Sequence, residues 1–400
     1  MAATADSPLE YPFHTRRALE PPGEWARLRT ECPMAEIQLS SGDRASLLTR
    51  YDDVKQTLAD PRFTRQLNVE GAARITSESS GIFANENPVS QGEAHQRWRR
   101  LVGKYFTAKR MSALRPQIEE MAGRLIDRME AGGRPADLVS DFAFPLPVWV
   151  ICDLLGVSVG DRDRFASWSE KMMSLSRYDQ SEIDTAETDF TTYMMDLIAV
   201  KRDRPQDDLI SELVAVADSE DGRLSEFEAM LTARGLLMAG HETTANMIGK
   251  MVAMLLADRR RWEQLLADPG LVGSAVEEVL RFDASGFGLP RYLSEDLKLE
   301  GGTLPGGTTV ISSLSAANRD ERAFEHADEL DLTRTPNAHL TFGVGAHSCL
   351  GQALARTELQ IALDALLRRL PALHLAVPAE ELPPREGMLV GGFERVLVRW

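Results

Sequence analysis

Apolar residues recur every three or four positions through most of the middle and the end of the chain, a spacing that predicts helices. Such runs cover residues 112–129, 143–155, 161–176, 187–201, 225–257 and 352–370. The run 225–257 is the longest and is apolar on almost every side, so we expect it to cross the protein interior. Ser225 and Glu228 have the spacing of a capping box, which marks the start of that helix.

Strand-like segments occur near the amino terminus and again late in the chain. Residues 36–39 and 46–49 flank a polar turn, which predicts a hairpin, and a short helix is expected over 52–59. Segments 297–300 and 308–312, separated by glycine-rich turns, predict that the sheet is completed late in the chain. The pattern therefore predicts a mainly helical protein with a small sheet.

Composition narrows the class of protein. The 400 residues are 43% hydrophobic, which is enough for a large core, and length alone would suggest two or three domains. A net charge of −16 argues against nucleic acid or an anionic membrane as the main partner, and the amino terminus has no apolar segment of signal-peptide length. Cys32, Cys152 and Cys349 are too few and too scattered for a disulfide framework, which favours a reducing, cytoplasmic location.

One segment runs against the acidic balance of the chain. Residues 95–110 contain several basic side chains and no acidic one. The basic residues are Arg97, Arg99, Arg100, Lys104, Lys109 and Arg110. The segment is either a solvated helix face, which charge runs usually are, or a docking surface for an acidic electron-carrier protein.

The stretch 342–351 places a lone cysteine just before the expected helix 352–370. Gly343, Gly345 and Gly351 let the backbone fold tightly around this cysteine and approach a flat partner closely. Free N–H groups and the dipole at a helix start favour an anionic sulfur, the form that binds metals. The cysteine, Cys349, is therefore a candidate metal ligand, and the alternative is a small buried hydrophobic side chain.

A polar insert, residues 239–244, interrupts the longest apolar run. Glu242 beside Thr243 places an acid and a hydroxyl where apolar residues would pack better, which indicates a function. In isolation, the threonine could instead bond to a carbonyl of its own helix, and the carboxylate could reach solvent or an arginine.

These two motifs resemble elements of the cytochrome P-450 family. The stretch 342–351 resembles the haem-binding loop, in which a cysteine thiolate is the fifth ligand of haem iron, and the insert 239–244 resembles the oxygen-binding helix. Three further elements occur in the family's order, so the resemblance covers nearly the whole chain. They are His95-x-x-x-Arg99, Glu278-x-x-Arg281 and residues 316–320. Taken alone, the Glu278–Arg281 spacing is also compatible with an ordinary surface pair.

The resemblance implies a single cytochrome P-450 domain over residues 1–400, of the mainly α (α+β) class, with a helical part and a small β-rich side. It also implies haem b (iron protoporphyrin IX), with Cys349 as the axial ligand of the iron. Thr243 would position a water or the hydroperoxide, and Glu242 would relay protons during dioxygen activation. Ala239 and Gly240 are small and would leave room for dioxygen.

The resemblance assigns roles to three groups of residues. Cofactor contacts are His95, Arg99, Ala239, Gly240, Arg291, His339, Phe342, His347, Cys349 and Gly351. A structural triad that holds the cysteine loop is Glu278, Arg281 and Arg334. By loose analogy, substrate-pocket residues are Ile82, Phe83, Met173, Met238, Phe287, Leu289, Val390 and Phe393. Arginine and histidine suit the haem propionates, whereas apolar residues such as the last group are more often core than pocket.

The activity implied is that of a monooxygenase, which inserts one atom of dioxygen by hydroxylation or epoxidation into a lipophilic small molecule such as a polyketide, macrolide or terpenoid. Electrons would come from NAD(P)H through a ferredoxin reductase and a ferredoxin, and we expect a monomer that binds neither nucleic acid nor membrane. A non-oxidising haem-bearing recruitment module would lack the acid and alcohol at 242 and 243. A peroxide-driven haem peroxygenase would carry an arginine and a proline in that helix. This chain has the acid and the alcohol, which favours the monooxygenase.

Overall fold

The computed structural model describes residues 8–13, 19–75, 89–219, 224–284, 286 and 288–400. The chain forms two compact units. The sheet unit comprises Met1–Glu86, Glu278–Asp331 and Pro336–Cys349, and the helical unit comprises Asn87–Glu277, Leu332–Thr335 and Leu350–Trp400. Whether the two units form the single domain predicted over residues 1–400 depends on how they combine, so the single domain stays a prediction.

The sheet unit is built on a six-stranded sheet with the order β1-β2-β3-β9-β6-β4. Its strands are β1 (Leu9–Glu10), β2 (Met34–Gln38), β3 (Arg44–Leu48), β4 (Phe63–Thr64), β6 (Leu289–Leu293) and β9 (Thr308–Ser312). β2 and β3 form the predicted hairpin, and Gly42 in its turn has a φ of 86°, which favours glycine. β3 pairs in parallel with β9, so the amino-terminal hairpin joins a strand from the last quarter of the chain.

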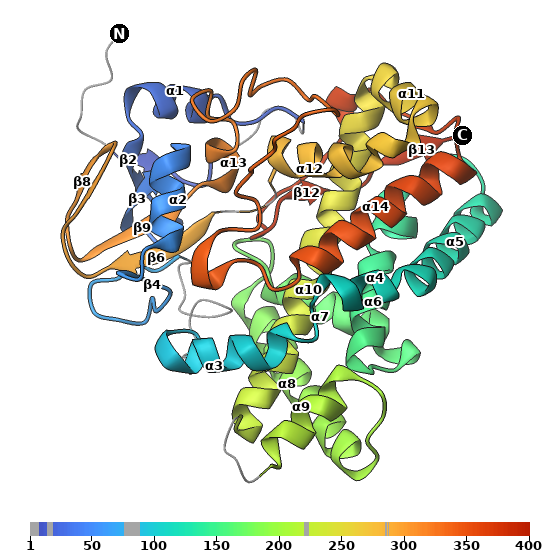
Figure 1. The fold of residues 1–400 in the computed structure, drawn as a ribbon, viewed down its shortest axis with the longest axis horizontal. Coiled ribbons are helices and arrows are strands. Elements are labelled where there is room, and N and C mark those ends of the chain that lie inside the picture. Colours follow the sequence, from blue (N-terminus) through green and yellow to red (C-terminus); the bar gives the residue numbers. More distant parts are fainter. Residues whose placement is uncertain (1–7, 14–18, 76–88, 220–223, 285, 287) are drawn as a thin grey trace. The chain divides into compact units, whose positions relative to one another are not determined.

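One helix of the sheet unit, α2 (Tyr51–Ala59), packs on this sheet, beside which it appears in blue in Figure 1. Val54 and Leu58 lie one turn apart on the same helix face and share a core cluster with Phe63, Leu293 and Val310. The helices α1 (Gly23–Glu31) and α13 (Leu314–Ala317) and the hairpin of β7 (Leu297–Leu299) and β8 (Gly302–Leu304) also belong to this unit. The core cluster thus fixes α2 against strands from both ends of the chain.

The helical unit is organised around α10 (Glu226–Ala257), drawn in yellow in Figure 1. The predicted capping box is present, because the Glu228 N–H donates to the Ser225 hydroxyl (3.1 Å) and the Ser225 N–H donates to the Glu228 carboxylate (2.7 Å). The helices α6 (Pro145–Leu155) and α14 (Gln352–Arg369) pack against α10. Most side chains of α10 are buried, and in the polar insert His241, Glu242 and Thr244 lie within the core of this unit.

The remaining elements of the helical unit surround α10. The helices are α3 (Gly92–Gly103), α4 (Ala108–Ala113), α5 (Arg115–Gly132), α7 (Arg162–Met172), α8 (Gln180–Asp203), α9 (Leu209–Ala217) and α11 (Arg259–Ala267), and residues of α12 (Val272–Phe282) belong to both units. The strands are β5 (Ala136–Asp137), β10 (His374–Leu375), β11 (Pro384–Arg385), β12 (Gly392–Phe393) and β13 (Leu397–Arg399). β11 pairs with β12, which places the segment 384–393 in a short hairpin.

The helices predicted over 225–257 and 352–370 are confirmed to within one residue at each end. The run predicted over 112–129 is divided between α4 and α5, because Pro116 lacks an N–H group and suits the first turn of a new helix. A π-helix (Val139–Ala143) precedes α6, which the apolar pattern alone did not reveal. Among the described residues, no helix is both long enough and apolar enough to cross a bilayer.

Candidate functional site

The cysteine loop, residues 342–349, lies in the sheet unit. Gly343 and Gly345 have φ values of 64° and 76°, which L side chains rarely adopt. A Cβ atom on Gly345 would also lie 3.0 Å from the Cα of Ala59 at the end of α2, so this glycine permits a close approach of two backbones. The Cys349 N–H donates to the Phe342 carbonyl (2.7 Å), and Cys349 is exposed. The loop therefore leaves Cys349 exposed on a constrained backbone.

Gly351 differs from the other two glycines of the motif. It caps α14 with an ordinary φ of −85°, and a Cβ atom there would meet nothing within 4 Å. The expectation of a tight turn thus applies to Gly343 and Gly345, and the structure gives no steric reason for glycine at 351. Any need for glycine at this position would have to come from a bound partner.

A closed ion-pair network, formed by Glu278 and Arg281 of α12, stabilises the segment before the cysteine loop. Both side chains are fully buried, and the guanidinium donates two bonds of 2.8 Å to the carboxylate. Arg281 also donates to the carbonyls of Asn318 (2.9 Å), Ala327 (2.8 Å) and Glu329 (3.0 Å). Every N–H of the arginine fork is therefore used inside the protein.

The network continues into the loop through one asparagine. The Asn318 side chain accepts from the Leu340 N–H (2.7 Å) and donates to the Thr341 hydroxyl (2.9 Å). Asn337 donates to Glu278 (3.1 Å) from the same segment. These bonds fix the backbone immediately ahead of Phe342. Arg334, the third member of the predicted triad, is half-buried in the helical unit, and its place in the triad stays a prediction.

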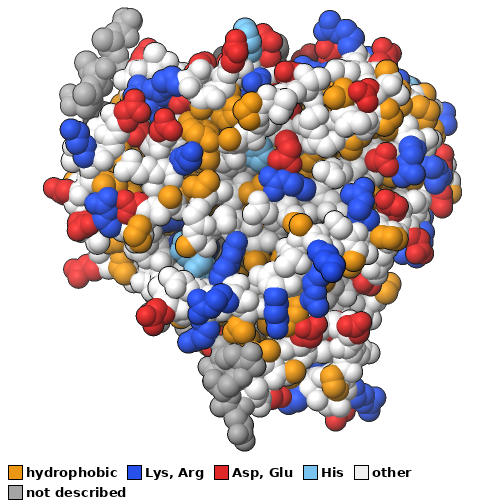
Figure 2. Space-filling view, viewed as in Figure 1, with side chains coloured by type: hydrophobic (Ala, Val, Ile, Leu, Met, Phe, Trp, Pro, Cys, Tyr) orange, Lys and Arg blue, Asp and Glu red, His pale blue; other side chains and the backbone are white. Residues whose placement is uncertain are grey.

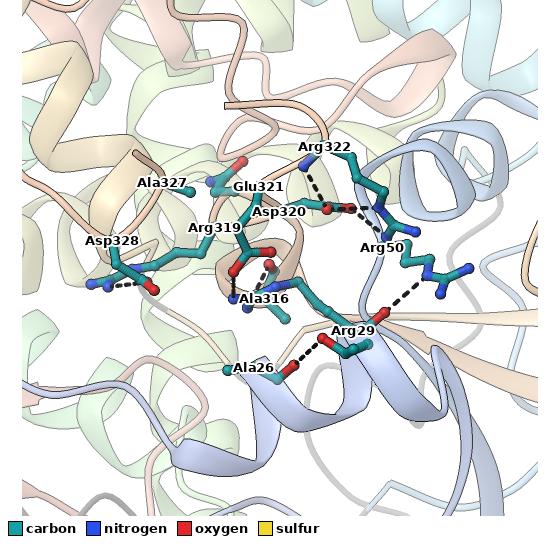
Figure 3. A network of polar contacts seen from close by, with 12 residues as sticks. Ala26, Arg29, Arg50, Ala316, Arg319, Asp320, Glu321, Arg322, Ala327 and Asp328 are labelled. Atoms are coloured by element: carbon teal, nitrogen blue, oxygen red, sulfur yellow. Dashed lines mark hydrogen bonds and ion pairs between the residues drawn. The ribbon is translucent and has the colours of Figure 1, made fainter. Parts of the chain in front are cut away.

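A second set of polar contacts, around residues 316–328, extends this framework (Figure 3). Arg319 donates to the carboxylate of Asp328 (3.1 Å) and lies over the ring of Phe282 at 3.5 Å. Arg29 of α1 donates to Glu321 (2.9 Å) and to the Ala316 carbonyl (3.3 Å). The element 316–320 is thus held to α1 and α12 by arginine side chains, which indicates a structural role.

Arg291 on β6 is the candidate cofactor contact with the clearest chemistry. Its side chain is buried, and its one hydrogen bond among the described residues goes to the carbonyl of the preceding Pro290 (2.8 Å). Burial, and secondarily the charge of Arg65, lowers the pKa of Arg291 to about 9. A buried arginine beside a second cation and without a carboxylate partner in the described structure suits an anionic group such as a haem propionate.

The other predicted cofactor contacts are divided between the units. His339, Phe342 and His347 lie in the sheet unit, where the rings of His339 and Phe342 are 5.9 Å apart. His95 and Arg99 lie on α3 in the helical unit, where His95 is buried and stacks on Trp98 at 5.7 Å. The structure thus places these residues within two groups, and their contacts with haem stay a prediction.

The middle of α10 has one accessible strip in an otherwise buried stretch. Ala239 and Thr243, one turn apart, are exposed, and the Thr243 hydroxyl donates to the Ala239 carbonyl (3.1 Å). Gly240 faces another way, because a Cβ atom there would lie 2.6 Å from Ile151 on α6. Gly240 is therefore explained by helix packing, whereas Ala239 and Thr243 border open space.

Glu242 is fully buried and pairs with Arg385 of β11, to which its Oε1 atom accepts a hydrogen bond. Arg385 also pairs with Glu170 of α7 at 3.0 Å. Burial acts to lower the pKa of Arg385, but the two carboxylates outweigh burial and raise the pKa. The Oε2 atom of Glu242 is buried and has no hydrogen-bond partner among the described residues.

A cavity of about 280 Å³ lies beside this cluster in the helical unit. Glu170, Arg385 and Asn246 supply polar walls, and Phe144 and Phe393 supply apolar walls. Phe393 was predicted as a substrate-pocket residue, and here it faces the same cavity as the charged cluster.

The other predicted pocket residues belong to both units. Met173, Met238 and Val390 are buried in the helical unit, and the Leu389 N–H donates to the Met173 carbonyl (2.9 Å), so the segments carrying Met173 and Val390 are adjacent. Leu289 packs against the core of the sheet unit. Ile82, Phe83 and Phe287 lie outside the described residues.

Sequence reasoning missed Arg385 and Glu170, which are far from Glu242 in the chain and carry no local signal. It also missed Glu358, a fully buried carboxyl on α14. Burial raises the pKa of Glu358 well above its usual range, opposed by a weak interaction with the Thr244 hydroxyl that falls short of normal hydrogen-bond geometry. The signal for Glu358 was available, because it lies one turn from Leu354 on the apolar face of its helix.

The basic segment 95–110 forms α3, α4 and the turn between them, and Figure 2 shows Lys and Arg side chains gathered over these helices. Arg97 differs from the others because its guanidinium forms an ion pair with Glu228 of α10 at 3.2 Å. Lys104 and Arg110 lie over the ring of Tyr105 at 4.7 and 5.0 Å. The surface is therefore basic but is partly organised by contacts within the unit.

Comparisons with known proteins agree on one family. The family model for cytochrome P-450 matches residues 32–388. Mycinamicin IV hydroxylase/epoxidase of Micromonospora griseorubida is 43% identical over 402 residues, which cover 99% of this chain and 100% of that protein. Nocardicin C N-oxygenase of Nocardia uniformis subsp. tsuyamanensis is 40% identical, with 98% of each chain covered. The crystal structure of LnmA, a cytochrome P-450 hydroxylase of leinamycin biosynthesis in Streptomyces atroolivaceus, matches with a TM-score of 0.89 and 42% identity, covering 98% of this chain and 100% of that one.

Proposed function

Because the chain belongs to the cytochrome P-450 family, we propose that the Cys349 thiolate is the axial ligand of its haem iron. The protein is a monooxygenase, with haem as its cofactor and dioxygen as a substrate. The observation that carries the assignment of Cys349 is its exposed position on a loop shaped by Gly343 and Gly345. The closed network of Glu278 and Arg281 would keep this sulfur in one position.

Haem carries two propionates, and the residues present fit such an anion. Arg291 is a buried cation without a carboxylate partner among the described residues, which is unfavourable unless an anion binds there. His95, Arg99, His339 and His347 are proposed as further donors to the propionates or their surroundings. Arg334 is proposed to complete the triad with Glu278 and Arg281.

When bound, a thiolate-ligated haem supplies the oxygen-activating chemistry of the reaction. We propose that this chain contributes the protons. Glu242 would hold and pass on a proton from its buried carboxylate, and the exposed Thr243 hydroxyl would position the water that receives it. For that task the Thr243 hydroxyl must exchange its bond to the Ala239 carbonyl for one to water, which a side-chain rotation allows.

We propose a lipophilic secondary metabolite, such as a polyketide, macrolide or terpenoid, as the substrate. Support comes from relatives named for the oxidation of mycinamicin IV and nocardicin C, and from the apolar Met173, Met238, Val390 and Phe393 in the helical unit. We propose NAD(P)H as the electron source, through a ferredoxin reductase and a ferredoxin that docks on the basic surface of α3 and α4. A monomer in the cytoplasm is proposed on the cysteine usage and acidic charge of the chain.

The test is the spectrum of the reduced, carbon-monoxide-bound protein with matched cysteine variants. We expect the strongly red-shifted haem band that thiolate ligation gives, its loss in Cys349→Ser, and its retention in Cys32→Ser, which changes another exposed cysteine. A band typical of histidine ligation in the parent, or an unchanged band in Cys349→Ser, would overturn the assignment. Product formation with NADPH and a ferredoxin pair, compared with peroxide alone, separates the monooxygenase from the peroxygenase.

A further inference from the structure

Two arginines of the sheet unit meet where the edge strand β4 pairs with β6. The register of this antiparallel pair joins Thr64 to Tyr292. Arg65 follows Thr64 directly, so the next position along the same register faces Arg291. Residues that face each other in this way have Cβ atoms about 4.5–5.5 Å apart and side chains on one face of the sheet. The charge of Arg65 does reach Arg291, because after burial it is the second cause that lowers the pKa of Arg291.

Neither of these two arginines has an acidic partner among the described residues. Arg291 is buried and donates only to the Pro290 carbonyl (2.8 Å) in that part of the chain. Arg65 is accessible to solvent, yet the protein around it lowers the pKa of its guanidinium by burial. The Arg65 guanidinium is therefore incompletely hydrated although it is accessible, which favours an anion as its partner.

A neighbouring arginine shows how the same segment treats an ordinary surface cation. Arg62, three residues before Arg65, donates to both oxygens of Asp60 (3.0 and 2.6 Å). The described structure thus supplies a carboxylate to Arg62 and supplies none to Arg65 or Arg291. Two facing cations without an acid are unfavourable by themselves, and an anion bound between them removes this repulsion.

The two arginines lie on the face of the sheet that contacts the cysteine loop. Leu289, Arg291 and Leu293 share this face of β6, because alternate residues of a strand point the same way. Leu293 belongs to the core cluster of the sheet unit, against which Leu289 and Val344 of the cysteine loop pack. A Cβ atom on Gly343 would lie 4.0 Å from the Leu289 side chain. An anion held by the two arginines would therefore lie near the cysteine loop.

We propose that Arg65 and Arg291 form a two-arginine clamp for one carboxylate, with Arg291 as its buried arm and Arg65 as its accessible arm. A guanidinium presents parallel N–H groups that match the two oxygens of a carboxylate. The carboxylate belongs either to a haem propionate or to an acidic substrate. The inference rests on the proposed function, which supplies both haem and substrate. It adds Arg65, to which the family resemblance assigns no role.

The first measurement is the rate at which the haem-loaded protein loses haem to apomyoglobin, which does not depend on turnover. If the clamp holds a propionate, Arg65→Met should speed this loss about tenfold, because a charge-assisted hydrogen bond is removed. Arg65→Lys should restore part of the retention, since lysine keeps the charge without the fork. Arg62→Met is the matched control, because Arg62 is bound by Asp60, and it should lose haem at the parent rate.

The second measurement is the spectral titration of the haem-loaded protein with dodecanoic acid and with its methyl ester. If the clamp holds a substrate carboxylate, Arg65→Met should weaken the binding of the acid about tenfold and leave that of the ester unchanged. Haem loss should then stay at the parent rate. The two measurements therefore identify the source of the carboxylate, and the inference is wrong if Arg65→Met changes neither quantity.

A cycle of single and double variants tests whether both arginines hold the same carboxylate. Arg291→Met removes a buried charge that has no acidic partner among the described residues, so the fold should tolerate it, which circular dichroism checks. For one shared carboxylate, the effect of the double variant should differ more than about twofold from the product of the two single effects. Effects that multiply without such a difference would mean independent sites and would overturn the clamp.

Failure of the proposed function gives a different result. In that case the parent itself would lack the thiolate band or would form no oxygenated product. A parent with the band, together with parent-like haem loss and dodecanoate binding in Arg65→Met, would overturn the clamp alone. Equal changes in Arg62→Met would also overturn it, because they would show a general effect of surface charge.

Discussion

Two fully buried carboxylates, Glu278 of the sheet unit and Glu242 of the helical unit, each pair with an arginine. The two pairs differ in how completely their polar atoms are hydrogen-bonded. Both oxygens of Glu278 are bonded, and Arg281 donates five hydrogen bonds. Glu242 uses one oxygen toward Arg385, and its other oxygen has no partner in the described part of the chain.

The difference indicates what each pair does. A buried charge pair stabilises a fold only when every donor and acceptor is satisfied, as around Arg281. The pair at Glu242 keeps one oxygen unsatisfied, and its arginine lines a cavity, an arrangement that is unfavourable for stability alone and would suit the proposed proton transfer. Completeness of hydrogen bonding is therefore the feature that would separate the structural ion pair at Glu278 from the pair at Glu242, for which we propose a proton-transfer role.

The largest loss of stability is expected when the buried Glu278–Arg281 pair is broken. Arg281→Met leaves the Glu278 charge buried without its cation and should lower the free energy of unfolding by about 3–5 kcal/mol. Urea unfolding followed by circular dichroism measures this. Arg44→Met is the matched control in the same unit, because its pair with Glu36 is exposed on both sides, and we expect a loss below about 1 kcal/mol. Equal unfolding midpoints for Arg281→Met and the parent would contradict the structural role.

The next largest change in stability is expected at Glu358, where the free energy of unfolding should depend on pH. Burial raises its pKa in the folded state, so the folded protein holds a proton that the unfolded chain releases above about pH 4.3. The stability that this group contributes is therefore lost as the pH rises from about 4.3 toward the raised pKa of the folded state, by up to about 1.4 kcal/mol per pH unit. Glu358→Gln cannot ionise, and its stability relative to the parent should increase as the pH rises above about 4.3 toward the raised pKa of the folded state.

The control for Glu358 is Glu380→Gln, which makes the same change at an exposed position. Its difference from the parent in urea unfolding should stay flat across the same pH range. A flat difference for Glu358→Gln as well would show that the carboxyl is ionised in the folded protein and that water reaches it.

Much of the fold could be predicted from local patterns. The capping box at Ser225, the helix after Cys349 and the first hairpin each depend on residues close together in the chain, and all three are confirmed. The family, the fold class and the monooxygenase function predicted from the motifs are confirmed by the comparisons. The parallel pairing of β3 with β9 was beyond this reasoning, because it joins segments about 260 residues apart.

The candidate site divides in the same way. The Glu278–Arg281 spacing is local and was visible, whereas Arg385 is 143 residues from Glu242 and has no motif around it. The alternative that Glu242 reaches an arginine could be stated from the sequence, but the arginine could not be named. The roles of Cys349, Thr243 and the propionate contacts stay predictions, since they depend on a bound cofactor.

His241 provides a smaller test of the region around Glu242. Burial lowers its pKa, so the folded protein keeps the ring neutral while the unfolded chain takes up a proton below about pH 6.5. Acidification from pH 6.5 to 5.5 therefore favours unfolding by up to about 1.4 kcal/mol through this group. His241→Leu should remove that part of the pH dependence, and the exposed His374→Gln should not. Thermal unfolding at both pH values gives the comparison, and an unchanged pH dependence in His241→Leu would contradict a buried neutral ring.

The smallest loss of stability is expected at a surface pair in which an arginine binds both oxygens of a carboxylate, as Arg281 binds Glu278. Arg74 donates to both oxygens of Asp43 (2.8 and 2.9 Å), as Arg281 does to Glu278, but the two side chains are 52% and 30% exposed. The side-chain bond from Arg74 lowers the pKa of Asp43 to about 2, so its contribution is present above about pH 3.9 and is lost as the pH falls toward 2. Arg74→Gln should lower stability at pH 7 by less than about 1 kcal/mol, and by less still in high salt. Because geometry is shared and burial is not, a loss as large as that of Arg281→Met would mean that burial and complete bonding are not what distinguish the closed pair.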